Sequence, residues 1–383
     1  MGKLGGAVLL ICLGLLAGPA LADRLSDAKM AFQDSNPERA VALLRPLVAA
    51  GNPEAMSLLA EAHYFGIGTE QSFKTAIDLY SRATALGHIP STAMLGACLV
   101  RGDGVPVDLE RAVGLLTTAA KAGDPVGQRN LGLLYLDGQG VTQDDGAARL
   151  WIEKAALQGD SQGELLLGHL YHTGKGVERD VAQAAAWVTK SADRGNPVAQ
   201  RELGKLYRNG EGVKKDAFES AFWLESAARK GDGEARNLMA YAYYAGLGVP
   251  VDKEEAITRW RRSAELGDRL AQHNLGLIYL DGKDVPKDTA AAYDWFLRAA
   301  RQDYQVSMLL IAQIHGRGLG RPRDPVTAYA WLLLTKGVKD TLPAADQKIY
   351  DEFETTIRAT LTIEEAALAQ QKSVELKAGL QRS

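Results

Sequence analysis

A fixed pattern of apolar, polar and glycine positions restarts every 36 residues along most of the chain. One copy of this block is GDPVGQRNLGLLYLDGQGVTQDDGAARLWIEKAALQ, and no insertion separates it from its neighbours. The eight copies, called repeats 1 to 8, cover residues 51–338 and begin at Gly51, Gly87, Gly123, Gly159, Gly195, Gly231, Gly267 and Asp303. A constant period of this size predicts stacked helical units rather than one globular core.

Each repeat is expected to form two helices. The first opens with a capping residue before proline, as in Asp124-Pro125, and ends at a GxG turn that needs positive φ. We expect Asp284, which replaces the second glycine in repeat 7, to adopt that conformation as well. Glu219 and Glu255 are placed to complete capping boxes at the second helix. The expected caps of the second helices are Asp108, Asp144, Asp180, Asp216, Asp252, Asp288 and Asp324.

The apolar positions predict how the helices pack. In the first helix a small residue, Ala199 for example, precedes large apolar residues such as Leu203 and Tyr207 on one helical stripe. A glycine or alanine between them, such as Gly204, allows a partner helix to approach closely. A hairpin of this size cannot bury the apolar stripes of both its helices by itself, so the repeats must stack into a continuous core. The second helix carries a bulky residue that is usually tryptophan: Trp151, Trp187, Trp223, Trp295 and Trp331.

Two stretches carry a family resemblance. AQRELGKLYRNGEGVKKD, residues 199–216, and WIEKAALQGD, residues 151–160, resemble Sel1-like repeats, which are relatives of tetratricopeptide repeats. The resemblance covers about three-quarters of the chain. It implies an all-α fold, a right-handed α-solenoid of stacked two-helix repeats that serves as an adaptor, and it leaves the partner open.

The first 22 residues resemble a secretory signal peptide. Lys3 precedes an apolar segment over residues 7–17, and the small residue Ala22 ends a cleavage pattern. A membrane anchor is the alternative, although the apolar run is short for a bilayer span of roughly 20 residues. We therefore expect a mature chain that starts at Asp23, has no transmembrane segment, and is periplasmic or secreted.

Both ends of the repeat array are expected to carry caps. We expect residues 23–50 to form a capping half-repeat, whose helix begins at Asn36-Pro37 and is kinked at Pro46. We expect residues 339–383 to form a C-terminal cap of two helices, over 343–358 and 363–378. Thr362 and Glu365 have the spacing of a capping box at the start of the second of these helices. A docking role for this C-terminal segment is an alternative.

Composition narrows the class of partner. The net charge of −3 becomes −4 when Lys3 is removed with the leader, which does not favour nucleic acid as a partner.

Loss of Cys12 with the leader leaves Cys98 as the single cysteine, so no intramolecular disulfide can form. The residues equivalent to Cys98 in other repeats are all apolar, which predicts a buried hydrophobe rather than a reactive thiol.

A second stripe on the first helices varies from repeat to repeat, and in the related tetratricopeptide superhelix it lines the concave groove. We interpret it as a groove for a protein or peptide, with ordinary solvated surface as the alternative. The most promising part is the basic cluster Arg201, Lys205 and Arg208, flanked by Tyr241 and Tyr244. The full set is Tyr64, Arg129, Leu136, His169, His172, Arg201, Lys205, Arg208, Tyr241, Tyr244 and His273.

No pattern in the chain predicts catalysis. His169 and His172 have a spacing that can hold a metal, but two ligands do not make a site, so we expect no metal or cofactor. No nucleophile and base stand at a recognisable spacing, so we expect no enzyme. The leading hypothesis is a monomeric exported adaptor or scaffold in envelope assembly, exopolysaccharide export or signalling. The alternatives are a protein that binds or hydrolyses cell-wall fragments or β-lactams, as in cysteine-rich relatives, and a structural spacer.

Overall fold

The structure is a computed structural model that describes residues 18–335, 337, 339 and 344–381. Over these residues it contains twenty helices and no strand. Residues 1–17 of the predicted leader lie outside the described range, and the predicted cleavage site after Ala22 falls inside the first helix. None of the helices in the described range has the length and apolar character that a bilayer span requires.

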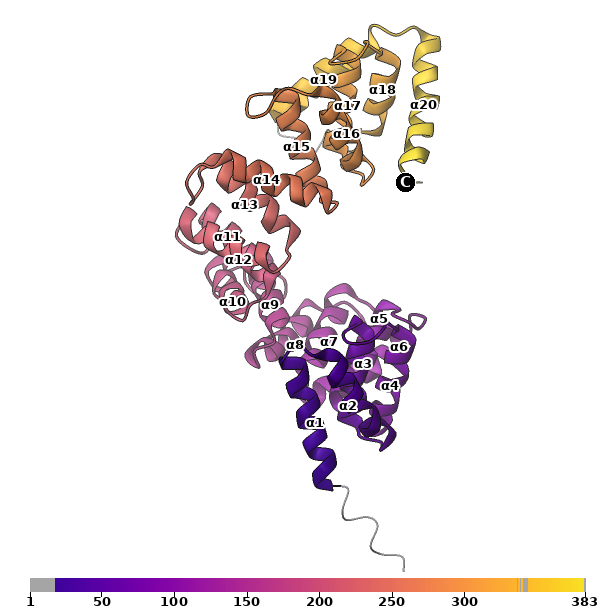
Figure 1. Ribbon diagram of the computed structural model, residues 1–383, viewed down its shortest axis with the longest axis vertical. Coiled ribbons are helices and arrows are strands. Elements are labelled where there is room, and N and C mark those ends of the chain that lie inside the picture. The colour runs from indigo at the N-terminus through magenta and orange to yellow at the C-terminus, as the bar shows by residue number, and fades with distance from the viewer. Residues whose placement is uncertain (1–17, 336, 338, 340–343, 382–383) are drawn as a thin grey trace, which may run out of the picture. The chain divides into compact units, whose positions relative to one another are not determined.

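The chain divides into two compact parts, with the boundary between Asn196 and Pro197. Within each part, consecutive helices pair and the pairs stack in order (Figure 1). The first part holds α1 (Gly18–Gln33), α2 (Pro37–Ala49), α3 (Pro53–Phe65), α4 (Phe73–Ala85), α5 (Ile89–Arg101), α6 (Leu109–Lys121), α7 (Pro125–Asp137), α8 (Asp145–Leu157), α9 (Ser161–Thr173) and α10 (Val181–Asp193). The second holds α11 (Pro197–Asn209), α12 (Ala217–Arg229), α13 (Gly233–Ala245), α14 (Lys253–Glu265), α15 (Arg269–Asp281), α16 (Thr289–Ala300), α17 (Gln305–Arg317), α18 (Pro325–Leu334), α19 (Ala344–Arg358) and α20 (Ile363–Gln381).

Hydrogen bonds at the repeat turn fix where each helix begins and ends. In repeat 3, Gly138 adopts φ +66° and its N–H donates to the carbonyl of Leu134, which closes α7. Asp144 caps α8, because its side chain accepts from the N–H of Ala147 at 2.9 Å. Every aspartate predicted to cap a second helix does so.

The predicted capping boxes at Glu219 and Glu255 are wrong. The backbone N–H of the cap Asp216 donates to the carbonyl of Tyr207, and that of Asp252 donates to Tyr243, both at 2.9 Å. The donor that the glutamate would accept from is therefore already used to join the two helices of the repeat. The C-terminal capping box predicted at Thr362 and Glu365 is confirmed in both directions.

Close approach of the two helices within a repeat forms the core. A Cβ at Gly132 would lie 2.6 Å from Cγ1 of Ile152 and 3.0 Å from the carbonyl oxygen of Ala148, so glycine is required there. Trp151, Trp187, Trp223 and Trp295 are half-buried at the flank of this core, and Trp151 lies under the ammonium of Lys154. Trp331 of repeat 8 is instead 1% exposed and belongs to the core. The residue that follows each of these five tryptophans is buried: Ile152, Val188, Leu224, Phe296 and Leu332.

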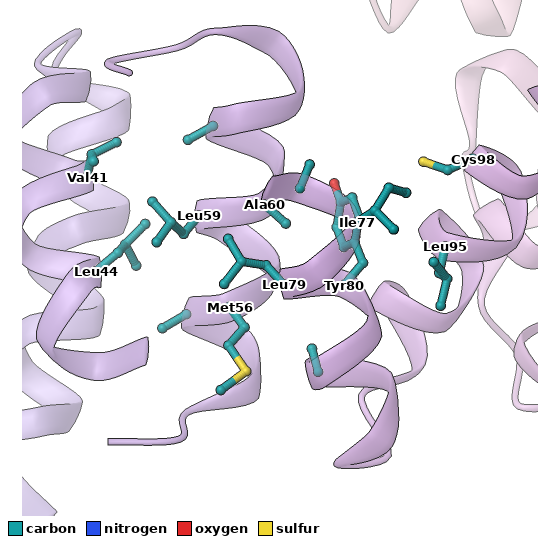
Figure 2. Packing of buried hydrophobic residues seen from close by; sticks show 14 of the residues in the cluster. Val41, Leu44, Met56, Leu59, Ala60, Ile77, Leu79, Tyr80, Leu95 and Cys98 are labelled. Carbon is teal, nitrogen blue, oxygen red and sulfur yellow. The ribbon is translucent and has the colours of Figure 1, made fainter. Parts of the chain in front are cut away.

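The core continues from one repeat to the next. In the first part, Leu44 of α2, Leu59 of α3, Tyr80 of α4 and Leu95 of α5 belong to a single buried cluster (Figure 2). Cys98 is part of it and fully buried, and burial raises the pKa of its thiol to about 11. The prediction that Cys98 is a packing residue is confirmed.

Within each part of the chain, the second glycine of the turn contacts the preceding helix pair. A Cβ at Gly176 would collide with the backbone of Asp145, and one at Gly248 would collide with Ala217. In repeat 7 the equivalent Asp284 does not have positive φ, contrary to the prediction. Its carboxylate accepts instead from the ammonium of Lys253, the first residue of the preceding second helix, at 2.7 Å. An ion pair thus replaces the close backbone contact.

Helical segments cover both ends of the array. The N-terminal segment is more than the predicted half-repeat, because α1 pairs with α2 as a first helix pairs with a second. The second helix of this pair continues through Pro46. At the other end α19 and α20 pack against α18, and the Lys372 ammonium donates to the Thr327 hydroxyl at 2.6 Å.

Replacing Gly132 with alanine should destabilise the protein. The added methyl group meets the side chain and backbone of α8, and overpacking of this kind costs about 1–3 kcal/mol of unfolding free energy. Gly114→Ala is the matched control, since Gly114 is an exposed helical glycine with no atom within 4 Å of its added Cβ. It should stabilise by about 0.5–1 kcal/mol. Equal effects of the two substitutions in denaturant unfolding would contradict this account.

Candidate partner-binding site

Two arginines predicted to line a groove instead join neighbouring repeats. Arg129 contacts both carboxylate oxygens of Asp160, at 2.6 and 2.9 Å, and Arg201 contacts Asp232 at 2.7 Å. Asp160 and Asp232 cap the first helix of the next repeat. Both arginine side chains are largely buried, so their main role is to fix the stacking of successive first helices.

The basic cluster of α11 is neutralised by nearby carboxylates. The Lys205 ammonium lies 2.5 Å from Glu234 and 3.2 Å from Glu202, and Arg201 also contacts both glutamates. Burial by itself would raise the pKa of Glu234, but the Lys205 hydrogen bond and the charges of Arg201 and Arg208 hold it below its ordinary value. The expectation of a free basic patch that pairs with a carboxylate on a partner is therefore corrected.

His273 does not line a groove, contrary to the prediction. Its side chain is buried, its Nδ1 lies 2.9 Å from the hydroxyl of Ser307, and its ring packs near Phe296 and Tyr304. Burial lowers the pKa of His273 to about 4. It is a neutral core residue that links repeats 7 and 8.

Tyr64 and Leu136 also contribute to stacking. The Tyr64 hydroxyl donates to Asp103 at 2.7 Å and accepts from Arg101 at 3.1 Å, which joins repeats 1 and 2. Leu136 is partly buried against the cluster around Ile152.

His169 is exposed and His172 is half-buried on α9. Among the residues that the structure describes, no group of three or more His, Cys, Asp or Glu is placed to hold a metal ion.

Tyr241 and Tyr244 line a cavity of about 560 Å³ between α13 and α15. Tyr241 is 49% exposed and Leu277 of α15 is 39% exposed, so both present apolar surface to solvent. The two tyrosines were predicted on this face from the sequence, whereas Trp260 of α14 was not. The complete lining is Tyr241, Tyr244, Trp260, Asn274, Leu277, Ile278, Leu280 and Asp281.

Trp260 reaches the cavity because repeat 6 shifts its tryptophan by one residue. Arg259 occupies the position that holds tryptophan in repeats 3, 4, 5, 7 and 8, and Trp260 follows it. One residue turns a helical side chain by about 100°, which moves Trp260 from the flank into the core, where it is 3% exposed. Its ring centroid lies 5.6 Å from that of Tyr244, and its N–H donates to Asn237 at 2.9 Å. The off-register tryptophan was the sequence signal for this cavity.

Polar contacts hold the cavity walls. The Tyr244 hydroxyl donates to Asp284 at 2.5 Å, and this hydrogen bond raises the pKa of the tyrosine. Asn274 donates to Asn237 at 2.8 Å, and no other described residue hydrogen-bonds its side chain, so its amide oxygen can accept from a ligand. The cavity therefore combines an apolar lining with two polar groups, the Asn274 amide and the Asp281 carboxylate. A lining of this kind suits the binding of a ligand or of a partner's side chain.

Burial of neutral His273 should make stability depend on pH. In the unfolded chain the pKa of His273 is near 6.5, whereas in the native protein it is about 4. Below pH 6.5 the unfolded state therefore binds a proton that the native state does not. The stability that neutral His273 contributes is fully present above pH 6.5 and is lost as the pH falls toward 4. Between pH 7 and 4.5 the wild type should lose about 2.5 kcal/mol more unfolding free energy than His273→Gln.

Denaturant unfolding at the two pH values measures this difference. His169→Gln, which changes an exposed histidine on a first helix, is the control for losing a histidine as such. Parallel losses in the wild type and in His273→Gln would contradict the assignment of His273 as a buried neutral group.

Comparison with known proteins agrees with this architecture. The Sel1 repeat model matches eight consecutive stretches: 53–88, 89–124, 125–160, 161–196, 197–232, 233–268, 269–304 and 305–334. No curated protein sequence matches the chain at a significant level.

Solved structures include several similar proteins. A Sel1 repeat protein from Oxalobacter formigenes has 29% identity and a TM-score of 0.59, over 64% of this chain and 96% of its own. A protective antigen of uropathogenic Escherichia coli strains that displays an SLR fold has 25% identity and a TM-score of 0.48, over 93% and 84%. An immunity protein from Pseudomonas aeruginosa has 21% identity and a TM-score of 0.43, over 55% and 82%. With its eight matched repeats and its array of paired helices, the chain belongs to the Sel1 repeat family.

Proposed function

We propose that the protein is an exported adaptor that binds a segment of another protein in the cavity lined by Tyr241, Trp260 and Leu277. Sel1 repeats typically mediate protein interactions, which supports the general class. The proposed binding site rests on one observation, the cavity on the first-helix face of repeats 6 and 7. The partner would insert a large apolar side chain there and donate a main-chain N–H to Asn274.

The exposure of the cavity residues supports this site over the basic cluster. Tyr241 and Leu277 expose apolar surface that is not needed for stacking, whereas Arg201 and Lys205 are occupied by carboxylates of their own chain. Aromatic side chains in a pocket are the common anchors of protein interfaces. Recognition would thus depend on shape and apolar burial more than on a charged clamp.

A periplasmic or secreted location is part of the proposal and is supported by the sequence of residues 1–22. An adaptor placed there would act in envelope assembly, in exopolysaccharide export or in signalling, as the resemblance to other family members implies. Fractionation of cells that express the full chain tests the location. Retention of the intact chain in the cytosol would contradict it.

Photo-crosslinking in cells tests the binding site. A crosslinking residue at Leu277 should capture one partner protein, whereas the same residue at Asp294, an exposed position of α16, should not. Capture at both positions, or at Asp294 alone, would remove the cavity from consideration.

Substitution at Tyr241 tests the same site with purified components. Tyr241→Ala should weaken binding of the captured partner by roughly 10- to 30-fold, as expected for an aromatic anchor, with little change in melting temperature. Leu157→Ser, which removes an exposed leucine from α8, is the control and should leave binding unchanged. Equal affinities of the wild type and Tyr241→Ala would contradict the proposal.

A further inference from the structure

Repeat 5 exposes two phenylalanines on its second helix. Phe218 and Phe222 lie one turn apart on α12 and are 70% and 57% exposed. The other repeats supply an internal comparison, because most of them hold polar or small residues at these two positions. The equivalent pairs are Lys74 and Asp78, Glu110 and Gly114, Gly146 and Leu150, Ala182 and Ala186, Glu254 and Thr258, Ala290 and Asp294, and Val326 and Ala330. Stacking therefore does not require aromatic residues there.

The two phenylalanines border an apolar cavity of about 480 Å³. Met239 and Tyr243 of α13 and Val249 of the following turn complete its apolar wall. A surface of this kind, with exposed aromatic rings beside a hollow, can take a large apolar side chain from a partner.

A cleft rich in arginine adjoins this cavity. It measures about 540 Å³, lies between α12 and α14, and shares Glu225 and Arg229 with the apolar cavity. Two glutamates and four arginines line it, which gives a net charge of +2. The charged lining residues are Glu225, Glu255, Arg229, Arg236, Arg259 and Arg262.

Two of these arginines have no carboxylate partner in the described part of the chain. Arg259 is satisfied, because it contacts Glu225 at 2.7 Å and Glu255 at 2.6 Å. Arg236 donates to the backbone carbonyl of Gly231 at 2.8 Å. No carboxylate among the described residues forms an ion pair with Arg262. The guanidinium groups of Arg236 and Arg262 are therefore available to a carboxylate from outside.

The same register shift that builds the aromatic cavity also shapes this cleft. Arg259 stands where a half-buried tryptophan covers the flank of the second helix in repeats 3, 4, 5 and 7. In repeat 6 that flank carries guanidinium and carboxylate groups instead of an indole ring. The cleft thus owes part of its charged lining to a change in repeat 6, at the border with repeat 5.

We propose that Phe218, Phe222, Arg236 and Arg262 form a second docking surface, which binds an acidic amphipathic segment of a partner protein. A large apolar side chain enters the cavity beside the phenylalanines, and carboxylates of the same segment pair with the two arginines. Charge complementarity selects this occupant. The glutamates within the cleft and the net negative charge of the chain oppose a polyanion such as nucleic acid. This surface lies outside the Tyr241 cavity and gives the protein a second binding site.

Selection of short random peptides displayed on phage, with the full chain as bait, tests the chemistry directly. Peptides that bind this surface should combine an aromatic or large aliphatic residue with several Asp or Glu residues. Replacement of those acidic residues by amides should weaken binding by about tenfold, because the contribution of the arginines is then lost.

Variants locate the binding. Phe218→Lys with Phe222→Asp introduces the pair that repeat 1 carries at these exposed positions, and it should weaken the selected acidic peptides by roughly 30-fold without a change in melting temperature. Arg262→Glu should weaken them by about tenfold. Tyr241→Ala is the control and should leave them bound, which separates this site from the proposed first-helix site.

Four results would overturn the proposal. They are the absence of enriched acidic peptides, peptide binding that survives the double phenylalanine variant, stronger binding to vesicles of anionic lipid than to any peptide, and a dimer in solution that the double variant dissociates. The last two would assign the surface to a membrane or to a second copy of this chain.

Discussion

Close approach between the two helices of each repeat is the constraint on which the rest of the structure depends. At Gly132 and Gly204 a Cβ would collide with the facing helix, so the spacing within the hairpin is set by the absence of a side chain. That spacing places Ile152 and Leu224 in the core and leaves the preceding tryptophans at its flank. Because hairpin geometry is nearly constant, stacking contacts recur at the same positions in successive repeats.

Constancy of the array makes a single deviation informative. In repeat 6 the tryptophan moves one residue toward the C-terminus, and the two faces of the hairpin change together. Trp260 enters the core beside Tyr244 and becomes part of the lining of an aromatic cavity. Arg259 takes the vacated position and forms part of an arginine-lined cleft. The register shift in repeat 6 therefore contributes to the lining of both candidate surfaces.

Charged side chains on the first helices mostly hold neighbouring repeats together. Arg129 and Arg201 bind the capping aspartates of the next repeat, and Lys205 binds Glu234. Partly buried pairs of this kind depend on both partners, since removal of one leaves the other desolvated and unpaired. The variable stripe therefore combines stacking contacts with a smaller set of exposed apolar residues.

The sequence by itself determined the period, the helix ends, the aspartate caps and the burial of Cys98, because these depend on local hydrogen bonds, backbone conformation and a pattern repeated eight times. Tertiary structure decided which stripe residues remain available. Arg201 meets Asp232 and His273 meets Ser307 only after the repeats stack, and these contacts span 31 and 34 residues. The same holds for Asp284, which pairs with Lys253 of the preceding repeat and does not adopt the positive φ of the glycines that it replaces. Local rules specify each hairpin, whereas contacts between hairpins decide which side chains are left for a partner.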